Sequence, residues 1–239
     1  MVCHQRKIRD DLMASDPRPV RQTLDGCGVI PITRAQAESV ILTYEWLGTM
    51  PKVGRAYYGL VCDDELHGVA CFGEGMGTNA KNLCGEANAS KAIALERGAC
   101  VHYAHPHAAS FLIANACKQA AEDHGWRIFY AYSDAEAGEI GTVYQACNWL
   151  YIGTGVGRGK GATWRYNYFD PTGEQYTSRR WRAHKSRVGL IWEAAEAAGW
   201  TRVRHMDKGR YLNFYGGDKR ECAALRKSLK YTTLPYPKR

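Results

Sequence analysis

The chain has 239 residues, of which 45% are hydrophobic and 23% are charged, and its formal net charge is +8. This length can bury a core and suits one domain, or one domain with an appendage. No apolar run approaches a membrane span and the first 16 residues are too polar for a signal peptide, so composition argues against a membrane protein and an intracellular protein is expected.

The chain begins with a polar stretch, residues 1–26, which contains the sequence DPRPV and is expected to form a partly ordered arm. The folded part begins at Gly28 with a strand in GVIPIT. Thr33 is a suitable N-cap for a helix that runs to about Trp46, because apolar residues recur after it at helical spacing. The segment YEWLGTMP then ends this helix.

Two predicted strands follow, Tyr57 to Cys62 and Leu66 to Phe72. The acidic turn DDE joins them into a hairpin that is expected beside the central strand. Residues 73–90 are rich in Gly, Asn and Ala, and are predicted to form a loop over the active face.

The centre of the chain reads as a βαβ unit. Ile93 to Tyr103 has the composition of a strand buried on both faces, with Gly98 as a candidate bulge. A turn of small residues leads into a helix that begins at about Ala108 and ends at Gly125, and residues 127–132 form the next strand. The N-terminus of such a helix offers N–H groups and a positive dipole to an anion such as a pyrophosphate.

Candidate chemical groups lie around this unit. Asp134 comes directly after its second strand, at the edge of a parallel sheet where ligands bind, and an N-cap of the next helix is the alternative. Tyr144 lies on that next helix and is either a proton donor or a core aromatic. Glu45, at the end of the first helix, is a base, a metal ligand or a solvated helix-end residue.

Histidines invite a metal interpretation. A spacing of two, as between His105 and His107, puts side chains on one face of an extended segment, and His102 with His124 or Cys100 would complete a site. The alternative is that loop histidines contact a phosphate or solvent. Ser110, at the start of the central helix, either hydrogen-bonds a donor group or caps the first turn.

The nine cysteines are scattered, odd in number and without a CxxC pair. This pattern argues against a disulfide framework and against a zinc ribbon. Most are therefore expected to be reduced core residues, such as Cys62, Cys71, Cys100 and Cys117.

The last third of the chain carries the positive charge. Residues 1–154 hold 13 Lys and Arg against 17 Asp and Glu, whereas residues 155–239 hold 19 against 7. Cations interleaved with aromatics indicate a partner with a phosphate backbone. Residues 153–161 read as a flexible cationic loop, and residues 177–200 as one helix whose basic N-terminal half opposes the helix dipole unless an anionic partner is bound.

The end of the chain is predicted to hold three further elements. Residues 201–216 read as a strand pair that turns at Asp207 to Gly209. Asp218 is then expected to start a last short helix, which ends near Lys230.

Five segments together resemble the Mom family, phage proteins related to the GNAT acyltransferases. The segments are YEWLGTMP, LERGACVHYA, AASFLIANAC, YSDAEAGEIGTVYQACNWLYIG and the terminal LPYPKR. The resemblance covers most of the chain and implies an α/β fold with a GNAT-like mixed central sheet and flanking helices, plus a basic C-terminal α+β extension. It also implies a phage-encoded enzyme that places a carbamoylmethyl group on adenine N6 of DNA in the cytoplasm of a bacterial host, and so protects that DNA from restriction.

Composition, charge distribution and the resemblance together predict an organisation of the chain. Residues 1–26 would be an arm, residues 27–154 the GNAT-like catalytic core, and residues 155–239 a basic DNA-binding extension packed on the core. Asp134, Tyr144 and Glu45 are the expected catalytic residues, although relatives commonly have a histidine where Glu45 stands.

The group donor is expected at the start of the central helix. Its binding residues would be His107, Ala108, Ala109, Ser110 and Phe111. The donor is left open between acetyl-CoA and another anionic carrier, since HPHAAS replaces the Gly-rich run of GNAT proteins. The resemblance implies iron in some relatives, without assigning ligands.

Double-stranded DNA is the expected macromolecular partner. Its expected contacts are basic residues, namely Arg158, Lys160, Arg165, Arg179, Arg180, Arg182, Lys185, Arg187 and Arg210. Because adenine N6 is held in the base stack, the base is expected to flip into an aromatic pocket. The candidate pocket residues are Tyr44, Trp46, Tyr57, Tyr58 and Trp149. The alternatives are an N-acetyltransferase acting on a small amine or a protein, and a non-enzymatic DNA-binding protein.

Overall fold

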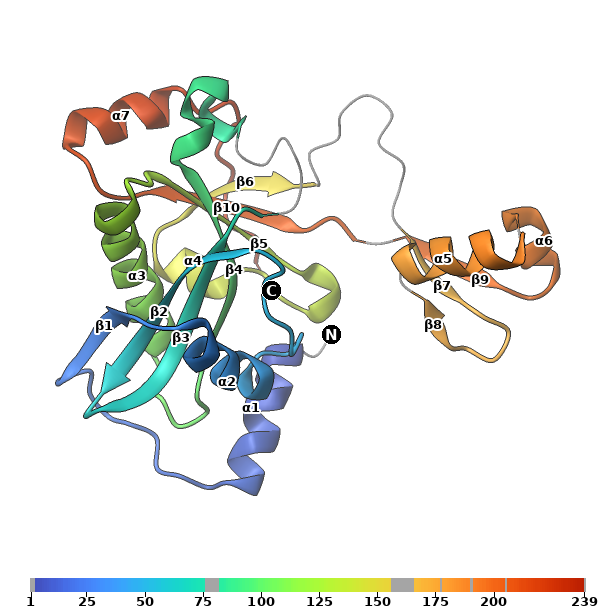
Figure 1. The fold of residues 1–239 in the computed structure, drawn as a ribbon, viewed down its shortest axis with the longest axis horizontal. Helices are drawn as coiled ribbons and strands as arrows, with labels where there is room; N and C mark the ends of the chain where they lie inside the picture. The colour runs from blue at the N-terminus through green and yellow to red at the C-terminus, as the bar shows by residue number, and fades with distance from the viewer. Residues whose placement is uncertain are drawn as a thin grey trace. The chain divides into compact units, whose positions relative to one another are not determined.

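The computed structural model describes residues 3–75, 82–155, 166–176, 178–189, 191–204 and 206–238 (Figure 1). The chain divides into two compact units: unit 1 is Met1–Gly157 with Lys208–Arg239, and unit 2 is Arg158–Asp207. The sequence analysis grouped residues 208–239 with the basic extension, whereas the structure places them in unit 1. In the described part of the chain, no helix has the length and apolar character needed to cross a membrane.

Unit 1 is built around a mixed seven-stranded sheet in the order β1-β2-β3-β4-β5-β10-β6. Its strands are β1 (Cys27–Pro31), β2 (Gly54–Cys62), β3 (Glu65–Gly73), β4 (Ala92–Cys100), β5 (Ile128–Ser133), β6 (Leu150–Thr154) and β10 (Gly209–Phe214). Neighbouring strands are antiparallel except for β4 and β5, which are parallel. The expected α/β fold with a mixed central sheet and flanking helices is confirmed.

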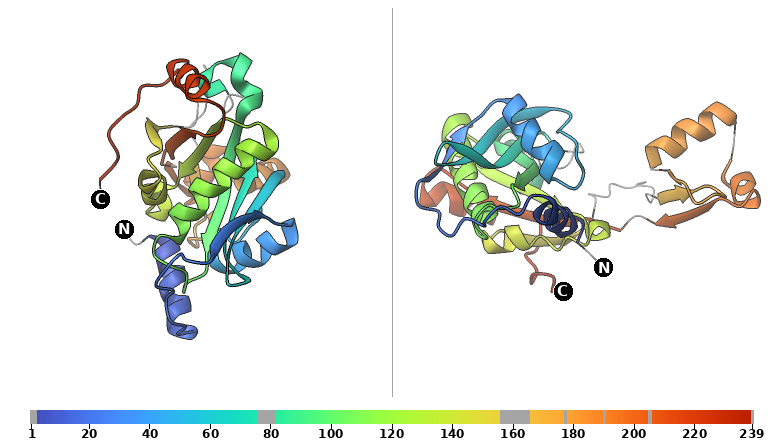
Figure 2. Two further views of the ribbon diagram at one scale, coloured as in Figure 1. Left: turned by 90° about the vertical axis from the view of Figure 1, so that its left-hand side faces the viewer. Right: turned by 90° about the horizontal axis from the view of Figure 1, so that it is seen from below.

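Helices cover both faces of this sheet (Figures 1 and 2). The described helical segments of unit 1 are α1 (His4–Ser15), α2 (Arg34–Tyr44), η1 (Asn82–Cys84), η2 (Glu86–Lys91), α3 (Ala108–His124), η3 (Ala135–Ala137), α4 (Thr142–Ala146) and α7 (Lys219–Lys227). Alternation along β3 separates the faces, because Val69 and Cys71 pack in the α2 core while Ala70 and Phe72 pack in the α3 core. The α3 core is the larger, and it also receives Tyr144 of α4.

Local sequence explains where the elements begin and end. Thr33 and Gln36 form a capping box at α2, since the Gln36 N–H donates to Thr33 Oγ1 (3.2 Å) and the Thr33 N–H donates to Gln36 Oε1 (2.9 Å). Asp63 and Asp64 both have positive φ, +48° and +66°, as a two-residue hairpin turn between β2 and β3 requires. Gly125 ends α3 with a φ of +71°. These predicted boundaries are confirmed.

The parallel pair β4 and β5 is short. It pairs over only three residues, Ala92 to Ala94 opposite Ile128 to Tyr130. Beyond them β4 pairs with β3 and β5 pairs with β10, so the two strands part toward their carboxyl ends. A register shift in β4 makes Glu96 the extra residue, which places the bulge two residues before the expected Gly98.

The residues before β1 are held against unit 1 by specific hydrogen bonds. Gln5 Nε2 donates to the Tyr44 carbonyl at the end of α2 (2.5 Å), and the Arg21 N–H donates to the Tyr103 carbonyl (2.9 Å). The Arg18 guanidinium lies 3.7 Å from the centre of the Tyr103 ring. The stretch expected to be a partly ordered arm therefore contains a helix, α1, and a docked connection to β1.

Two cysteines are joined, contrary to expectation. Cys27 and Cys62 are register partners on β1 and β2 and form a disulfide. The prediction of a reduced Cys62 is therefore wrong. The pairing could not be read from the sequence, because 35 residues separate the two cysteines and the register of β1 against β2 brings them together. Cys71, Cys100 and Cys117 are free, as expected.

Unit 2 is a small sheet with two helices. Its described elements are β7 (Tyr166–Phe169), β8 (Gln175–Tyr176), α5 (Ser178–Val188), α6 (Trp192–Ala197) and β9 (Thr201–Arg204), with strand order β8-β7-β9. Trp181, Ala195 and Trp200 form its core. The single helix predicted over residues 177–200 is wrong, because α5 ends before Gly189, whose φ is +64°. The predicted pairing of residues 201–204 with 209–216 is also wrong, since β9 pairs with β7 while β10 joins the sheet of unit 1.

Candidate active site

Asp134 lies at the carboxyl end of β5, and the residue is only 8% exposed. Oδ1 accepts from the Glu136 N–H (3.1 Å), so Asp134 is the N-cap of η3. Oδ2 lies 2.8 Å from Lys208 Nζ, on the segment that enters β10. The structure thus places the predicted carboxylate in an ion pair as well as in the capping position that was its alternative.

Glu139 joins Asp134 to Trp46 through hydrogen bonds, and the sequence analysis missed it. Its Oε2 accepts from the Asp134 N–H (3.2 Å) and its Oε1 accepts from Trp46 Nε1–H (3.0 Å). Burial raises the pKa of Glu139, and the charge of Asp134 adds to this, while the two hydrogen bonds oppose it. An available signal was a second acidic residue five positions after Asp134, between two glycines, Gly138 and Gly141, that both have positive φ.

Glu45 lies at the end of α2 and is 8% exposed, so it is not a solvated helix-end residue. Its Oε2 accepts from the Leu47 N–H (3.1 Å), and its Oε1 lies 3.9 Å from Arg97 Nε on β4. Burial raises the pKa of Glu45 to about 7; the charge of Glu139 also raises it and Arg97 lowers it. A group with this pKa exchanges its proton near neutrality, as a general base requires.

Tyr144 lies on α4 beside these carboxylates. Its ring centre is 5.3 Å from that of Trp149 and 5.2 Å from that of Tyr211. Burial raises the pKa of Tyr144, and the charges of Glu139 and Glu45 raise it further, so the phenol stays protonated. No described residue hydrogen-bonds its hydroxyl, which leaves that proton available for donation.

Glu45, Asp134, Glu139 and Tyr144 are called the acidic cluster below. Hydrogen bonds and mutual electrostatic effects connect all four, although the sequence separates Glu45 from the others by about ninety residues. The structure therefore brings the three predicted catalytic residues together, and Glu139 with Trp46 joins them.

The predicted donor site, the start of α3, lies against α4. Cys147 Sγ, at the end of α4, donates to the Ser110 carbonyl (3.4 Å). Within the described residues, the Ala108 N–H donates to His105 (2.8 Å) and the Phe111 N–H to His107 (3.0 Å), while the N–H groups of Ala109 and Ser110 have no protein acceptor. Two N–H groups at a helix N-terminus suit an anion.

His102, His105, His107 and His124, all within the described residues, do not come together as a metal site. Buried His102 has its Nε2 2.8 Å from the Asp16 carbonyl, and His124 stacks on Trp126 with ring centres 4.4 Å apart. His105 Nδ1 accepts from the His107 N–H (3.1 Å). In the ranges that the structure describes, no group of three or more His, Cys, Asp or Glu side chains is placed to hold a metal ion. The iron implied by the resemblance has no fitting ligands there.

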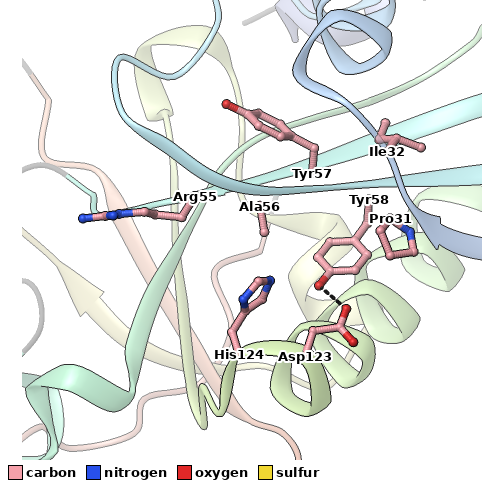
Figure 3. A pocket seen from close by; sticks show the side chains of 8 residues that line it. All are labelled: Pro31, Ile32, Arg55, Ala56, Tyr57, Tyr58, Asp123 and His124. Carbon is pink, nitrogen blue, oxygen red and sulfur yellow. Dashed lines mark hydrogen bonds between the residues drawn. The ribbon is translucent and has the colours of Figure 1, made fainter.

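The aromatic residues predicted to hold a flipped base lie in separate places. Trp46 touches the acidic cluster, and Tyr44 stacks near His102 with ring centres 6.0 Å apart. Tyr58 donates to Asp123 Oδ2 (2.7 Å) in a pocket of about 390 Å³, where Tyr57 points to the other side of β2 (Figure 3). Fully buried Trp149 belongs to the core. Of these residues, within the part of the chain that the structure describes, Trp46 is the one whose side chain hydrogen-bonds a carboxylate of the cluster.

The predicted DNA contacts are described only in part. Arg158, Lys160 and Arg165 lie outside the described residues. Arg179, Arg180 and Arg182 lie on α5, with side chains outside the description. Lys185 and Arg187 are exposed on the same helix. Arg210 is instead on β10 of unit 1, where an Nη donates to the Ile152 carbonyl (3.1 Å) and the guanidinium lies 4.7 Å from the Tyr231 ring centre.

Comparison with known proteins adds the following. Residues 27–238 match the model of the Mom protein family. No curated protein matches the chain.

Similar solved structures are acetyltransferases. A GNAT family acetyltransferase from Elizabethkingia anophelis with acetyl-CoA bound is 10% identical, with 79% of this chain and 97% of that chain covered and a TM-score of 0.40. Spermidine N-acetyltransferase from Vibrio cholerae, in complex with CoA and spermine, is 9% identical, with 79% and 95% covered and a TM-score of 0.43. An N-acetyltransferase from Staphylococcus aureus is 10% identical, with 79% and 98% covered and a TM-score of 0.40.

Proposed function

Because the chain belongs to the Mom protein family, we propose that it is a transferase that places a carbamoylmethyl-type group on adenine N6 in phage DNA. The product would protect that DNA from host restriction in the bacterial cytoplasm. The observation that carries the proposal is the acidic cluster, in which one carboxylate has a pKa near neutrality beside a protonated phenol.

The proposed chemistry uses Glu45 as the base. The lone pair of adenine N6 is delocalised into the ring, so bond formation at this nitrogen needs removal of one of its protons. Glu45, with a pKa of about 7, accepts that proton as the new N–C bond forms. Tyr144 donates a hydrogen bond to the leaving group of the donor. Asp134, through its ion pair with Lys208, holds that lysine at the carboxyl end of β5, beside the reacting groups.

The proposed donor is anionic. Its negative group would lie on the N–H groups of Ala109 and Ser110, at the positive end of the α3 dipole. The small side chain of half-buried Ala109 allows close approach to these N–H groups, whereas Ala108 is buried in the core. The anion of CoA or of another carrier fits this site equally well; acetyl-CoA itself would supply only an acetyl group, so a carbamoylmethyl product requires a carrier that bears that group.

Double-stranded DNA is the proposed partner of unit 2. Residues 158–207 hold ten Lys and Arg against five Asp and Glu, a net charge of +5. Exposed Lys185 and Arg187 on α5, with Arg202 on β9, suit phosphate contacts. The target adenine would leave the stack to reach the acidic cluster, with Trp46 as its stacking partner.

Mass spectrometry of nucleosides from DNA of expressing bacteria tests the function. We expect a new adenine species with the wild-type chain and none with Asp134→Asn. Asn still caps η3 but lacks the charge that faces Lys208, so circular dichroism should show the same fold. An unmodified adenine pool in wild-type cells would contradict the function, and modified adenine in Asp134→Asn cells would contradict the role of Asp134.

A further inference from the structure

Glu139 differs from Glu45 in how its oxygens are used. Both oxygens of Glu139 accept hydrogen bonds from N–H donors, Oε1 from Trp46 (3.0 Å) and Oε2 from Asp134 (3.2 Å). An N–H donor stabilises the ionised form of a carboxylate, because that form is the better acceptor. The hydrogen bonds therefore favour negative charge on Glu139.

Glu45 is less firmly held. One oxygen accepts from the Leu47 N–H (3.1 Å), and the other lies 3.9 Å from Arg97 Nε, beyond hydrogen-bond distance. Among the described residues, no side-chain donor lies within hydrogen-bond distance of this second oxygen, so a proton can add there. Of the two neighbouring carboxylates, Glu45 is thus the one whose geometry permits proton exchange.

The groups that interact with Glu45 come from five parts of the chain. Arg97 of β4 opposes a proton on Glu45, and Glu139 favours one. The backbone N–H groups of Leu47 and Gly48 oppose it from the end of α2 itself. Cys71 of β3 and Tyr144 of α4 also feel the charge of Glu45. Glu139 is an acidic neighbour whose negative charge raises the pKa of Glu45. Two carboxylates in one buried site repel each other, so ionising both costs free energy.

We infer that Glu139 is a positioning residue: held as an ionised acceptor by Trp46 and Asp134, it makes Glu45 the carboxylate that exchanges a proton with the substrate. This inference rests on the proposed function for the identity of the substrate, but not for the behaviour of the two carboxylates. It assigns a task to a residue that the sequence did not single out.

A purely structural role for Glu139 is the alternative. Glu139 also ties Trp46 to the turn after β5, and losing that tie would lower activity without any electrostatic effect. The titration of Glu45 separates the two roles, because a structural tie alone does not set the proton affinity of another carboxyl.

The test is a carbon-13 NMR titration of the full chain labelled at the glutamate carboxyls. Glu45→Gln assigns the Glu45 resonance by its loss. In the wild type we expect a Glu45 midpoint near pH 7. In Glu139→Gln, which lacks the charge, the midpoint should fall by roughly one pH unit, and in Glu139→Asp, which keeps it, the midpoint should stay raised.

A second variant covers the case in which Glu139→Gln fails to fold. Trp46→Phe removes one N–H donor from Glu139, so its negative charge becomes less favourable and the Glu45 midpoint should again fall. A Glu45 midpoint unchanged in every folded variant would overturn the inference.

Nucleoside mass spectrometry distinguishes this failure from failure of the proposed function. Wild-type adenine modification together with an unchanged Glu45 midpoint would refute only the role of Glu139. The expected titration without any modified adenine would refute only the DNA function.

Discussion

The acidic cluster of unit 1 and the basic residues of unit 2 use charge in opposite ways. Glu45 and Asp134 are 8% exposed and hydrogen-bonded, whereas Lys185, Arg187 and the arginines of β9 are exposed. Burial changes the proton affinity of an individual group, but exposed cations stay charged and act through their sum. Single substitutions should therefore be decisive in the cluster and gradual in unit 2.

Tyr144→Phe should give the largest effect. It removes only a hydroxyl that no described residue hydrogen-bonds, so the fold should survive while adenine modification falls by about 10²- to 10⁴-fold, the usual contribution of a positioned proton donor. Tyr236→Phe is the matched control, since the Tyr236 hydroxyl donates to the Trp149 carbonyl outside the cluster (2.9 Å). Quantitative nucleoside mass spectrometry measures both. Equal adenine modification in the two variants would contradict the claim that a single substitution in the acidic cluster is decisive.

Ala109→Leu should have the next largest effect, because added bulk at the start of α3 blocks an anionic donor from the N–H groups there. His107→Ala, which leaves those N–H groups open, should change modification by no more than about twofold. Calorimetry with CoA measures donor binding directly. If CoA does not bind and Ala109→Leu still abolishes modification, the donor is another anionic carrier; a harmless Ala109→Leu would show that the donor site is elsewhere.

Changing Arg180, Arg182 and Arg187 together to Ala should weaken duplex binding in a graded way. If each contacts one phosphate, the slope of log affinity against log salt should decrease by about 2.7, from three contributions of roughly 0.9. The triple Arg→Lys variant keeps the charges and should keep the slope. Fluorescence anisotropy at several salt concentrations measures it, and an unchanged slope in the Ala variant would place DNA away from α5.

The smallest expected effect is on stability. The pKa of Glu45 is about 7 in the folded chain against an ordinary 4.5, so its favourable contribution to folding is complete below about pH 4.5 and is lost as pH rises through 7. Glu45→Gln has no carboxyl to titrate and should not show this loss. Between pH 4 and pH 8, the free energy of unfolding of the wild type should therefore decrease by ~1–3 kcal/mol more than that of the variant. Urea denaturation at both pH values measures this, and parallel pH profiles would contradict a buried, titrating Glu45.

Structural features that depend on residues close together in the sequence could be predicted. The Thr33 cap, the Asp63-Asp64 turn and the strand, turn and helix around Ala108 all have local causes. Asp134 and Tyr144 followed from their positions after β5 and from the family resemblance. The structure adds that they lie together with Glu45 in the acidic cluster.

Features that depend on distant partners could not be predicted. Glu139 gains its setting from Trp46, 93 residues away, and Cys27 meets Cys62 only through the register of β1 and β2. β10 was misassigned for a related reason: GRYLNF lies within a basic stretch, so composition grouped it with unit 2 while its alternating side chains pack into the sheet of unit 1.

The position of β10 makes unit 2 an insertion within a hairpin. β6 and β10 are antiparallel neighbours, Thr154 is the register partner of Gly209, and the Gly155 N–H donates to the Lys208 carbonyl (3.1 Å). The chain therefore leaves and re-enters the sheet at adjacent points, which a short turn could join directly. Evolution or a designer can exchange everything between those points without disturbing a strand of the unit 1 sheet, so the DNA recognition proposed for unit 2 is separable from the chemistry proposed for unit 1.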